Sequence, residues 1–318
     1  MLTSLFFDLS AAKQLNEFCA CAISERRQDF LAKGAQGEPV FLLHDSSEAK
    51  YTPGIRYRHV NASFHNLCRI DVSGKIIENS FAVIACDPDT PELYELFISC
   101  FGAAIQSLPP LTETKQINAI ILNLLSLFRE LAKPSSIEIT GFWAELFLIR
   151  QSSRKIELLR HWHSDPYERF DFSFSDSFLE VKSTIKTTRI HEFSYNQLRL
   201  PEGRAGVIAS ILMLPNDGGV GILELAKDID NSLPEQHDLR NKLWSNVAKA
   251  LGADFSKILD RRFDLNYSRD NLQLYYMGDI PTIDQALDPR ISNIRYSANL
   301  EGVQSSATEA TWASYGMT

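Results

Sequence analysis

The chain has no uninterrupted apolar run that approaches the roughly 18 residues that a membrane-spanning helix needs. Its first residues, MLTSLFFDLSAAKQ, also lack the positively charged segment and the cleavage site of a secretory signal peptide. These two absences predict a cytoplasmic protein.

Cysteine is scarce and shows no ligand spacing. Five cysteines, an odd number, lie in the first third of the chain: Cys19, Cys21, Cys68, Cys86 and Cys100. Zinc sites and disulfide frameworks need cysteines at defined spacings, and neither pattern is present. The sequence therefore predicts free, buried thiols in a reducing compartment.

The chain also lacks net positive charge, since 40 acidic residues against 32 basic ones give −8 at pH 7. Proteins that coat nucleic acid without selectivity neutralise its phosphates with Lys and Arg, so this class is disfavoured. A local basic surface remains open, because residues 182–204 carry five basic and two acidic side chains, an excess of three. Taken alone, such an excess is typical of a solvated face. No Walker lysine or dinucleotide fingerprint occurs, so a nucleotide-driven step would require a partner protein.

With 318 residues and 44% hydrophobic composition, the chain is long enough for two or three compact units. Helical spacing of apolar residues predicts a helix over residues 1 to about 32, and short strands follow between about 39 and 100. Two helical segments come next, at 91–108 and 117–133. The second stops before Pro134, which with Ser135 and Ser136 marks a domain boundary.

We therefore expect an N-terminal α+β domain at 1–133 and a central core with a mixed sheet at 134–235. A C-terminal helical and strand region is expected at 236–300. The segment 301–318 has small polar residues with little periodicity, which predicts a flexible tail.

A helix is predicted after the boundary, in IEITGFWAELFLIRQ, and it carries an unusual carboxylate. Phe142, Leu146 and Ile149 form its apolar stripe, and Glu145 falls on the same stripe by its spacing. A carboxylate on a core-facing stripe is costly unless a partner compensates it. Glu145 is therefore either an edge residue that meets an arginine or part of a functional site.

The stretch FDFSFSDSFLEVKST at 170–184 predicts a hairpin that turns at Ser175 and Asp176. Its pairing makes Asp171 the cross-strand neighbour of Glu180, with Lys182 on the same face. Two like charges about 4.5–5.5 Å apart at Cβ need a cation between them. Lys182 can serve in a structural triad, but clustered oxygens suit a divalent ion better. Mg²⁺ takes one or two carboxylates and keeps several waters, so Asp171, Glu180 and the Val181 carbonyl are candidate ligands.

The next segment, HEFSYNQLRL, is predicted to pass from strand into helix. Ser194 is a candidate N-cap, and Gln197 stands at the capping-box position three residues later. Gln197 is either this cap partner or a residue that orients a phosphate or water beside a metal. His161 and His163 flank Trp162 at strand-like spacing, but no third ligand lies nearby in sequence, which favours structural histidines.

The order of these residues resembles the pattern of the PD-(D/E)XK nuclease superfamily: a helical glutamate, an aspartate and Glu-Val-Lys on a hairpin, and a later glutamine. The order GFWAELFLIR, HW, FDFSF, LEVKST, FSYNQL and IPTIDQALDPRISNIRYSANL is similar to a prokaryotic PD-(D/E)XK-motif family of restriction and phage-defence loci. The likeness extends from the early DVSG strand to the late RYSANL. One departure is that Phe170, rather than the proline of the motif, precedes Asp171.

The resemblance implies a restriction-endonuclease-like core and a metal-dependent endonuclease that hydrolyses DNA phosphodiester bonds. It implies Mg²⁺, with Mn²⁺ able to substitute, held by Asp171, Glu180, Val181 and Glu145. Lys182 would position or deprotonate the attacking water, and Gln197 would be a secondary site residue.

The resemblance also implies DNA as the substrate, ATPase and methyltransferase proteins of the same defence locus as partners, and a homodimer able to cut both strands. The alternative is a catalytically inactive subunit of nuclease fold that binds DNA or acts as a scaffold in a defence complex. In that case Asp171, Glu180 and Lys182 would form a self-neutralising surface triad of little value to stability.

Overall fold

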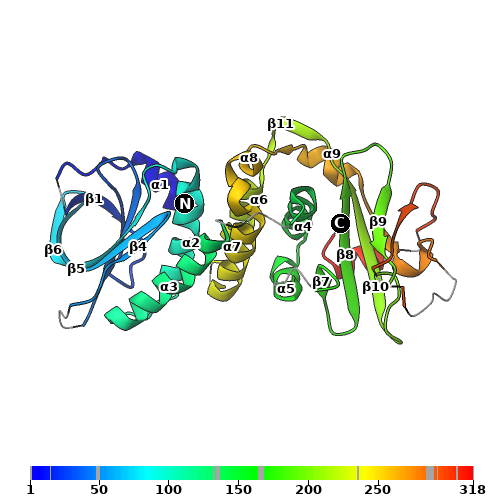
Figure 1. Ribbon diagram of the computed structural model, residues 1–318, viewed down its shortest axis with the longest axis horizontal. Helices are drawn as coiled ribbons and strands as arrows, with labels where there is room; N and C mark the ends of the chain where they lie inside the picture. The colour runs from blue at the N-terminus through cyan, green and yellow to red at the C-terminus, as the bar shows by residue number, and fades with distance from the viewer. Residues whose placement is uncertain are drawn as a thin grey trace. The chain divides into compact units, whose positions relative to one another are not determined.

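The computed structural model describes residues 2–14, 16–47, 51–131, 133, 137–163, 168–234, 236–283, 290–291, 293–305 and 307–317. The chain forms two compact units, and each is described by itself. The first unit comprises Met1–Pro134 and Glu235–Ala253, and the second comprises Ser135–Pro234 and Asp254–Thr318. Figure 1 colours both units along the chain.

The first unit is built on a six-stranded sheet with the strand order β1-β2-β3-β6-β5-β4. A parallel pairing of β1 with β5 closes β1, β2, β3, β6 and β5 into a ring, and β4 adds to the edge of β5. Alternate residues face the inside of this ring, including Phe30, Leu42, Ile70 and Phe81. The strands are β1 (Glu17–Ala22), β2 (Phe30–Lys33), β3 (Pro39–His44), β4 (Ile55–Tyr57), β5 (Val60–Val72) and β6 (Lys75–Cys86).

The helix expected over residues 1 to about 32 is wrong. Among the residues described in this segment, 2–14 and 16–32, only α1 (Leu2–Asp8) is helical, and the chain then enters β1 and β2. β1 finds hydrogen-bond partners on both sides, β2 and β5, and such tertiary pairing overrides a weak local preference. The strands expected between 39 and 100 are present as β3 to β6.

Helices cover the outside of the ring. Phe41 of β3 contacts Phe97 and Phe101 of α2, with ring centroids 5.6 and 5.8 Å apart. The helices of this unit are α1, α2 (Tyr94–Gln106), α3 (Thr114–Glu130) and α7 (His237–Leu251).

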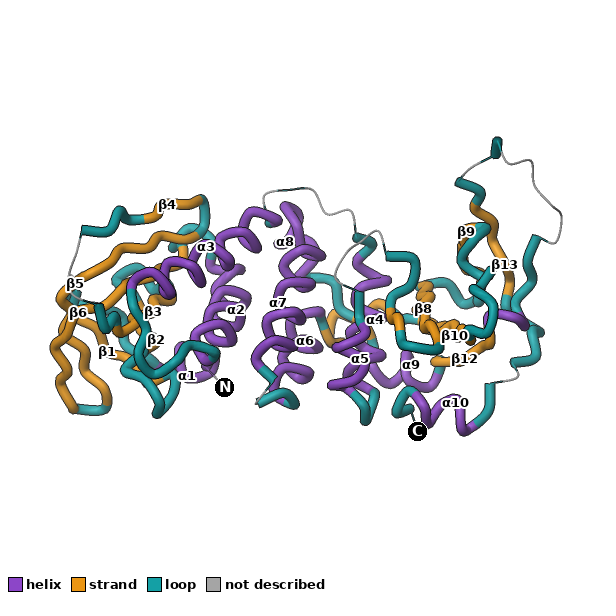
Figure 2. The backbone as a smooth tube through the Cα atoms, turned by 90° about the horizontal axis from the view of Figure 1, so that it is seen from below, coloured by secondary structure: helices purple, strands orange, loops and turns teal. Residues whose placement is uncertain are grey.

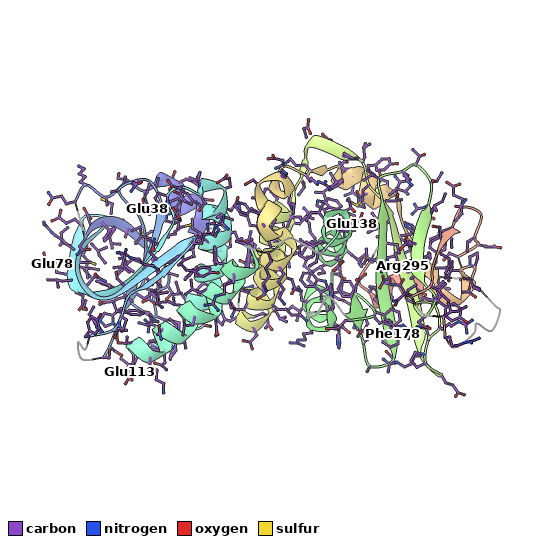
Figure 3. The ribbon with its side chains drawn as sticks, in the orientation of Figure 1. Glu38, Glu78, Glu113, Glu138, Phe178 and Arg295 are labelled. Carbon is purple, nitrogen blue, oxygen red and sulfur yellow. The ribbon has the colours of Figure 1, made fainter. Side chains whose placement is uncertain are left out.

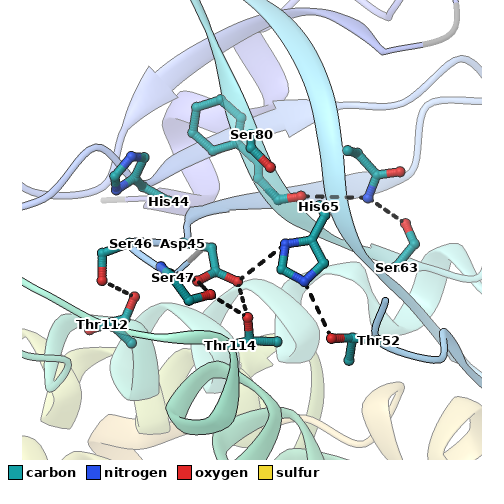
Figure 4. Close-up of polar contacts among 12 residues, drawn as sticks. His44, Asp45, Ser46, Ser47, Thr52, Ser63, His65, Ser80, Thr112 and Thr114 are labelled. Carbon is teal, nitrogen blue, oxygen red and sulfur yellow. Dashed lines mark hydrogen bonds and ion pairs between the residues drawn. The ribbon is translucent and has the colours of Figure 1, made fainter. Parts of the chain in front are cut away.

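A buried polar cluster joins the end of β3 to β5 and to the start of α3 (Figure 4). Asp45 accepts hydrogen bonds from the Ser47 amide at 3.0 Å, the Ser47 hydroxyl at 2.5 Å and the Thr114 hydroxyl at 2.5 Å. His65, in the left-handed region at φ 55°, places its Nδ1 atom 3.9 Å from Asp45 and its Nε2 atom 3.3 Å from the Thr52 hydroxyl.

The second unit contains a mixed sheet with the strand order β12-β10-β8-β7. β10 runs parallel to β8, whereas β12 and β7 are antiparallel to their neighbours. The mixed α/β architecture expected from the sequence is confirmed. The strands are β7 (Phe172–Ser173), β8 (Ser177–Thr184), β10 (Ala205–Leu212) and β12 (Leu272–Tyr276).

This sheet lies between helices and a two-stranded ribbon. Contacts of α4 with β8 and of α5 with β7 place these helices on one side, and β9 (Ile190–Ser194) pairs with β13 (Arg295–Asn299) on the other. Figure 2 shows this order within the second unit. The helices are α4 (Ile139–Gln151), α5 (Lys155–His161), α6 (Ile222–Asn231), α8 (Phe255–Leu259), α9 (Leu265–Asp270) and α10 (Glu309–Ser314), and β11 spans Pro215–Val220.

The segmentation differs in detail from the four expected regions. Residues 235–253 belong to the first unit, and 254–318 belong to the second. The expected boundary at Pro134, Ser135 and Ser136 lies outside the described residues. The described part of 301–318 packs on the second unit instead of extending as a tail: Tyr315 is buried, and its carbonyl accepts a 2.6 Å hydrogen bond from Ser152. Burial of an aromatic anchor there outweighs the polar composition.

The structure bears on the expected free cysteines and on the lack of a long apolar run. All five cysteines are free, and three of them, Cys68, Cys86 and Cys100, are buried, whereas Cys19 and Cys21 are half-buried. Among the helices in the described ranges, none is long and apolar enough to cross a membrane.

Candidate functional site

Glu145 lies on α4 and is buried, as its place on the apolar stripe predicts. Its Oε2 atom accepts a 2.7 Å hydrogen bond from the Trp162 indole and lies 3.0 Å from Nε2 of His163. These two side chains offset part of the cost of burying a carboxylate. Glu145 is thus held in place by the segment that leads to the hairpin, and not by an arginine.

Asp171 stands directly before β7, at the edge of the sheet. The pairing of Phe172 with Leu179 continues the hairpin to Asp171 and Glu180, the cross-strand neighbours that the sequence predicts. Oδ2 of Asp171 accepts a 2.7 Å hydrogen bond from the Val181 amide, which fixes the carboxylate against β8. The Asp171 carbonyl accepts a 2.8 Å bond from the backbone amide of His163.

Glu180 is buried on β8, and within the described ranges only its Oε1 atom has hydrogen-bond partners. Oε1 lies 3.0 Å from the Lys182 ammonium and accepts a 2.5 Å hydrogen bond from the Gln197 amide. Oε2 is buried and has no hydrogen-bond partner among the described residues. An unpaired buried carboxylate oxygen is costly, so this atom is a ready position for a cation. The Lys182 ammonium also lies 5.4 Å from the centre of the Phe193 ring.

The electrostatics of the three carboxylates show an uncompensated negative charge. Burial, together with the charges of Glu180 and Glu145, holds the pKa of Asp171 well above its usual range, against the opposing effects of the Val181 amide and Lys182. Burial also raises the pKa of Glu180, although Lys182 opposes this shift. One lysine does not balance three neighbouring acids, and a bound divalent cation would favour the ionised forms of Asp171 and Glu180.

Side chains of three residues offer ligand atoms within 4.8 Å of one another: Glu145, His163 and Asp171. The interpretation of His163 as a purely structural residue therefore overlooked a candidate metal ligand. Its possible partners lie 18 residues earlier, on α4, and eight residues later, beside β7, so no local spacing reveals the group. The only sign of this ligand in the sequence was the pair of histidines in His161-Trp162-His163, shortly before the hairpin.

The helix expected after Ser194 is wrong, because β9 ends at Ser194 and residues 195–198 form a turn. The backbone N–H of Gln197 donates to the Ser194 carbonyl at 2.9 Å, and the backbone N–H of Ser194 donates to the side-chain oxygen of Gln197 at 3.4 Å. These bonds close the turn without a helix. They leave the side-chain nitrogen of Gln197 to donate to Glu180. Without a helix, Gln197 is not a helix-cap partner, and its role beside a metal stays a prediction.

The fold and the site together define a mixed α/β protein in which a buried Glu-Val-Lys strand faces an aspartate across a hairpin and a glutamate from a flanking helix. A family described as "Putative PD-(D/E)XK family member (DUF4420)" matches residues 3–301. The chain therefore belongs to this family, whose description relates it to the PD-(D/E)XK nuclease superfamily, in which divalent metals are typical. Searches of curated proteins and of solved structures found no match.

Proposed function

We propose that this protein is a Mg²⁺-dependent endonuclease that hydrolyses DNA phosphodiester bonds within a prokaryotic restriction or anti-phage defence system. The observation that carries the proposal is the buried Oε2 atom of Glu180, which lacks a partner among the described residues and lies in a carboxylate whose other oxygen is 3.0 Å from the Lys182 side-chain nitrogen.

Asp171 and Glu180 would hold the metal ion, together with the Val181 carbonyl and Glu145. In a β-strand the N–H and C=O groups of one residue point to the same side, and the Val181 N–H already points at Asp171. The Val181 carbonyl therefore faces the same edge of β8. Hard oxygen donors of this kind suit Mg²⁺, and Mn²⁺ accepts the same ligands. When bound, the ion would supply Lewis-acid stabilisation of the charge on the phosphoryl oxygens.

Lys182 would act on the attacking water. Its ammonium group is anchored by Glu180 at 3.0 Å and lies over the face of Phe193, so its position is restricted. As an ammonium group it can orient the water and stabilise negative charge that develops on the phosphate, and as a neutral amine it would accept the proton of the water. Gln197 would support this geometry by holding Oε1 of Glu180, which would leave Oε2 available as a metal ligand.

Several further properties belong to the same proposal. The partners would be DNA and the ATPase and methyltransferase proteins of the same defence locus, in the cytoplasm. A homodimer would place two sites on one duplex, because one site hydrolyses one strand at a time.

Cleavage of supercoiled plasmid tests this function. Wild-type protein in Mg²⁺ or Mn²⁺ should nick the plasmid, EDTA should stop the reaction, and Lys182→Ala should lower the rate by about 10²-fold or more. Lys186→Ala is the matched control, because Lys186 is exposed on the loop after the same strand. Cleavage that persists in Lys182→Ala would refute the assigned site, and absence of cleavage by the wild type would favour a nuclease-fold scaffold.

A further inference from the structure

Four side chains beside the hairpin form a chain of stacked contacts. The Arg169 guanidinium lies 4.8 Å from the centre of the Phe170 ring, and the Arg204 guanidinium lies 4.6 Å from that of Phe178. The two rings stack on each other at 4.4 Å with an interplanar angle of 28°. Aromatic faces hold guanidinium groups without neutralising them, so both positive charges are positioned in advance.

A third arginine is held in the same way. The Arg199 guanidinium lies 4.1 Å from the centre of the Tyr195 ring, and it donates a 2.9 Å hydrogen bond to the Ile283 carbonyl. The Arg199 carbonyl in turn accepts a hydrogen bond from Arg169, which connects this residue to the stack. We call Arg169, Arg199 and Arg204 the arginine cluster.

The arginine cluster differs from other arginines of the second unit in its partners. Arg169 and Arg199 are exposed and Arg204 is half-buried, and within the described part of the chain none of them forms an ion pair with a carboxylate. Other arginines of this unit do form such pairs: Arg150 with Asp228, Arg154 with Glu157, Arg262 with Glu224 and Arg295 with Glu192. In a chain of net charge −8, the arginine cluster is thus a concentrated positive charge with no ion-paired carboxylate among the residues that the structure describes.

The cluster borders the candidate site. Phe178, Glu180 and Lys182 alternate along β8 and share one face of the strand. Gln197, which holds Glu180, lies in the turn between Tyr195 and Arg199. Phe178 is labelled on β8 in Figure 3, where Arg295 marks the ribbon strand β13.

We propose that the arginine cluster binds the phosphate backbone of duplex DNA and guides one strand to Glu180 and Lys182. The inference rests on the proposed function, because it assigns the surface by which the same site receives its substrate. Arg169 and Phe178 cover Phe170, and Phe170 and Arg204 cover Phe178, so these two rings are not open to stacked bases, and Arg199 occupies one face of Tyr195. Binding here therefore reads charge and backbone geometry and is independent of base sequence.

The test measures binding without cleavage. Affinity of the Lys182→Ala protein for labelled duplexes of two unrelated sequences is measured against salt concentration, in EDTA and in Mg²⁺, by fluorescence anisotropy. Arg169→Gln, Arg199→Gln and Arg204→Gln are introduced singly and together. Glutamine keeps a planar donor and removes the charge. Arg150→Gln is the matched control, since Arg150 is ion-paired and on α4.

We expect each cluster variant to lower affinity severalfold for both sequences and to reduce the slope of log K against log salt by roughly 0.9, the value for one lost phosphate contact. The triple variant should reduce the slope by roughly three times as much, and Arg150→Gln should leave it unchanged. Thermal midpoints of all variants establish that they are folded.

The inference would be overturned if the slope of log K against log salt were the same with and without the three cluster changes. It would also be overturned if Arg150→Gln lowered DNA affinity as much as the cluster variants do. A loss for only one of the two sequences would also overturn it, because base readout would then be involved. If the cluster variants lose binding as expected while the wild-type protein fails to nick DNA, the nuclease proposal fails and the DNA-binding surface stands.

Discussion

Each unit contains a polar cluster with buried acid, a single carboxylate in the first unit and three in the second, and different groups stabilise the two clusters. In the first unit, Asp45 accepts hydrogen bonds on both oxygens from Ser47 and Thr114. Burial works to raise the pKa of Asp45, but these hydrogen bonds, with a smaller effect of His65, lower it below the usual range. Neutral donors are therefore sufficient for a single buried acid.

In the second unit, three acids lie together and the donors are too few. The pKa of Asp171 is held well above its usual range by burial and by the charges of Glu180 and Glu145, and one oxygen of Glu180 has no partner among the described residues. Such an arrangement is unfavourable for the metal-free protein. The comparison shows that burial alone does not indicate function, whereas an unbalanced set of donors does.

The largest difference between the two clusters should appear in the rate of plasmid nicking. Asp171→Asn should reduce plasmid nicking by at least about 10²-fold, because it removes a charged ligand of the metal ion. Asp45→Asn should leave the initial rate of nicking close to that of the wild type at a temperature where the protein is folded. Comparable losses in both variants would remove the distinction between the clusters.

The order of the two variants should be reversed for stability, where Asp45→Asn has the larger destabilising effect. Asp45→Asn should lower the free energy of unfolding of the first unit by about 2–3 kcal/mol, because the amide nitrogen would face the Ser47 or Thr114 donors. Asp171→Asn in EDTA should leave the thermal midpoint unchanged or raise it, because repulsion among the acids is relieved. A lower midpoint for Asp171→Asn in EDTA would contradict this comparison.

The pH dependence separates the two clusters further. Asp171 has a folded pKa above its unfolded value, so the metal-free protein loses stability as the pH rises through the window between these values. Asp45 has a lowered folded pKa, so its contribution is present above the ordinary carboxyl pKa of about 3.9 and is lost as the pH falls through the lowered value.

The thermal midpoint of Asp171→Asn should therefore exceed that of the wild type near neutral pH, and that of Asp45→Asn should lie below it. Both differences should shrink toward zero as the pH falls. For Asp171→Asn this change should begin nearer to neutral pH. Calorimetric scans across the acidic range check both windows, and a common midpoint for the two changes would be inconsistent with the assigned pKa directions.

The smallest effect is expected at His65. Its Nδ1 atom is 3.9 Å from Asp45, beyond hydrogen-bond range, and its backbone is in the left-handed region that asparagine tolerates better than most residues. His65→Asn should change the free energy of unfolding by less than about 1 kcal/mol. A loss as large as that of Asp45→Asn would show that the imidazole is a main support of the cluster.

Much of the second unit was predictable because its signals are local. The alternation in 170–184 predicted the hairpin and the neighbours Asp171 and Glu180, and helical spacing predicted a buried Glu145. The short Glu-Val-Lys motif is specific only in combination with the order of the other site residues along the chain. The family match confirms the resemblance to the PD-(D/E)XK pattern.

The remaining features depend on contacts that no local pattern encodes. Closure of the ring by β1 and β5 turned an apparent helix into strands, and a turn closed by Gln197 replaced the expected helix after Ser194. His163 meets Glu145 only through the tertiary fold. Arg199 and Arg204 appeared in the sequence merely as part of an excess of positive charge, and Arg169 lies outside that stretch, because stacking on specific rings is a property of the packed structure.

The most direct measurement is calorimetric titration of EDTA-stripped protein with Mg²⁺ and Mn²⁺, comparing the wild type with Asp171→Asn and Asp45→Asn. We expect the wild type and Asp45→Asn to bind the ion alike and Asp171→Asn to bind it at least about tenfold more weakly. Absence of ion binding by the wild type, or equal weakening in both variants, would contradict the claim that the carboxylates of the second unit form a metal site.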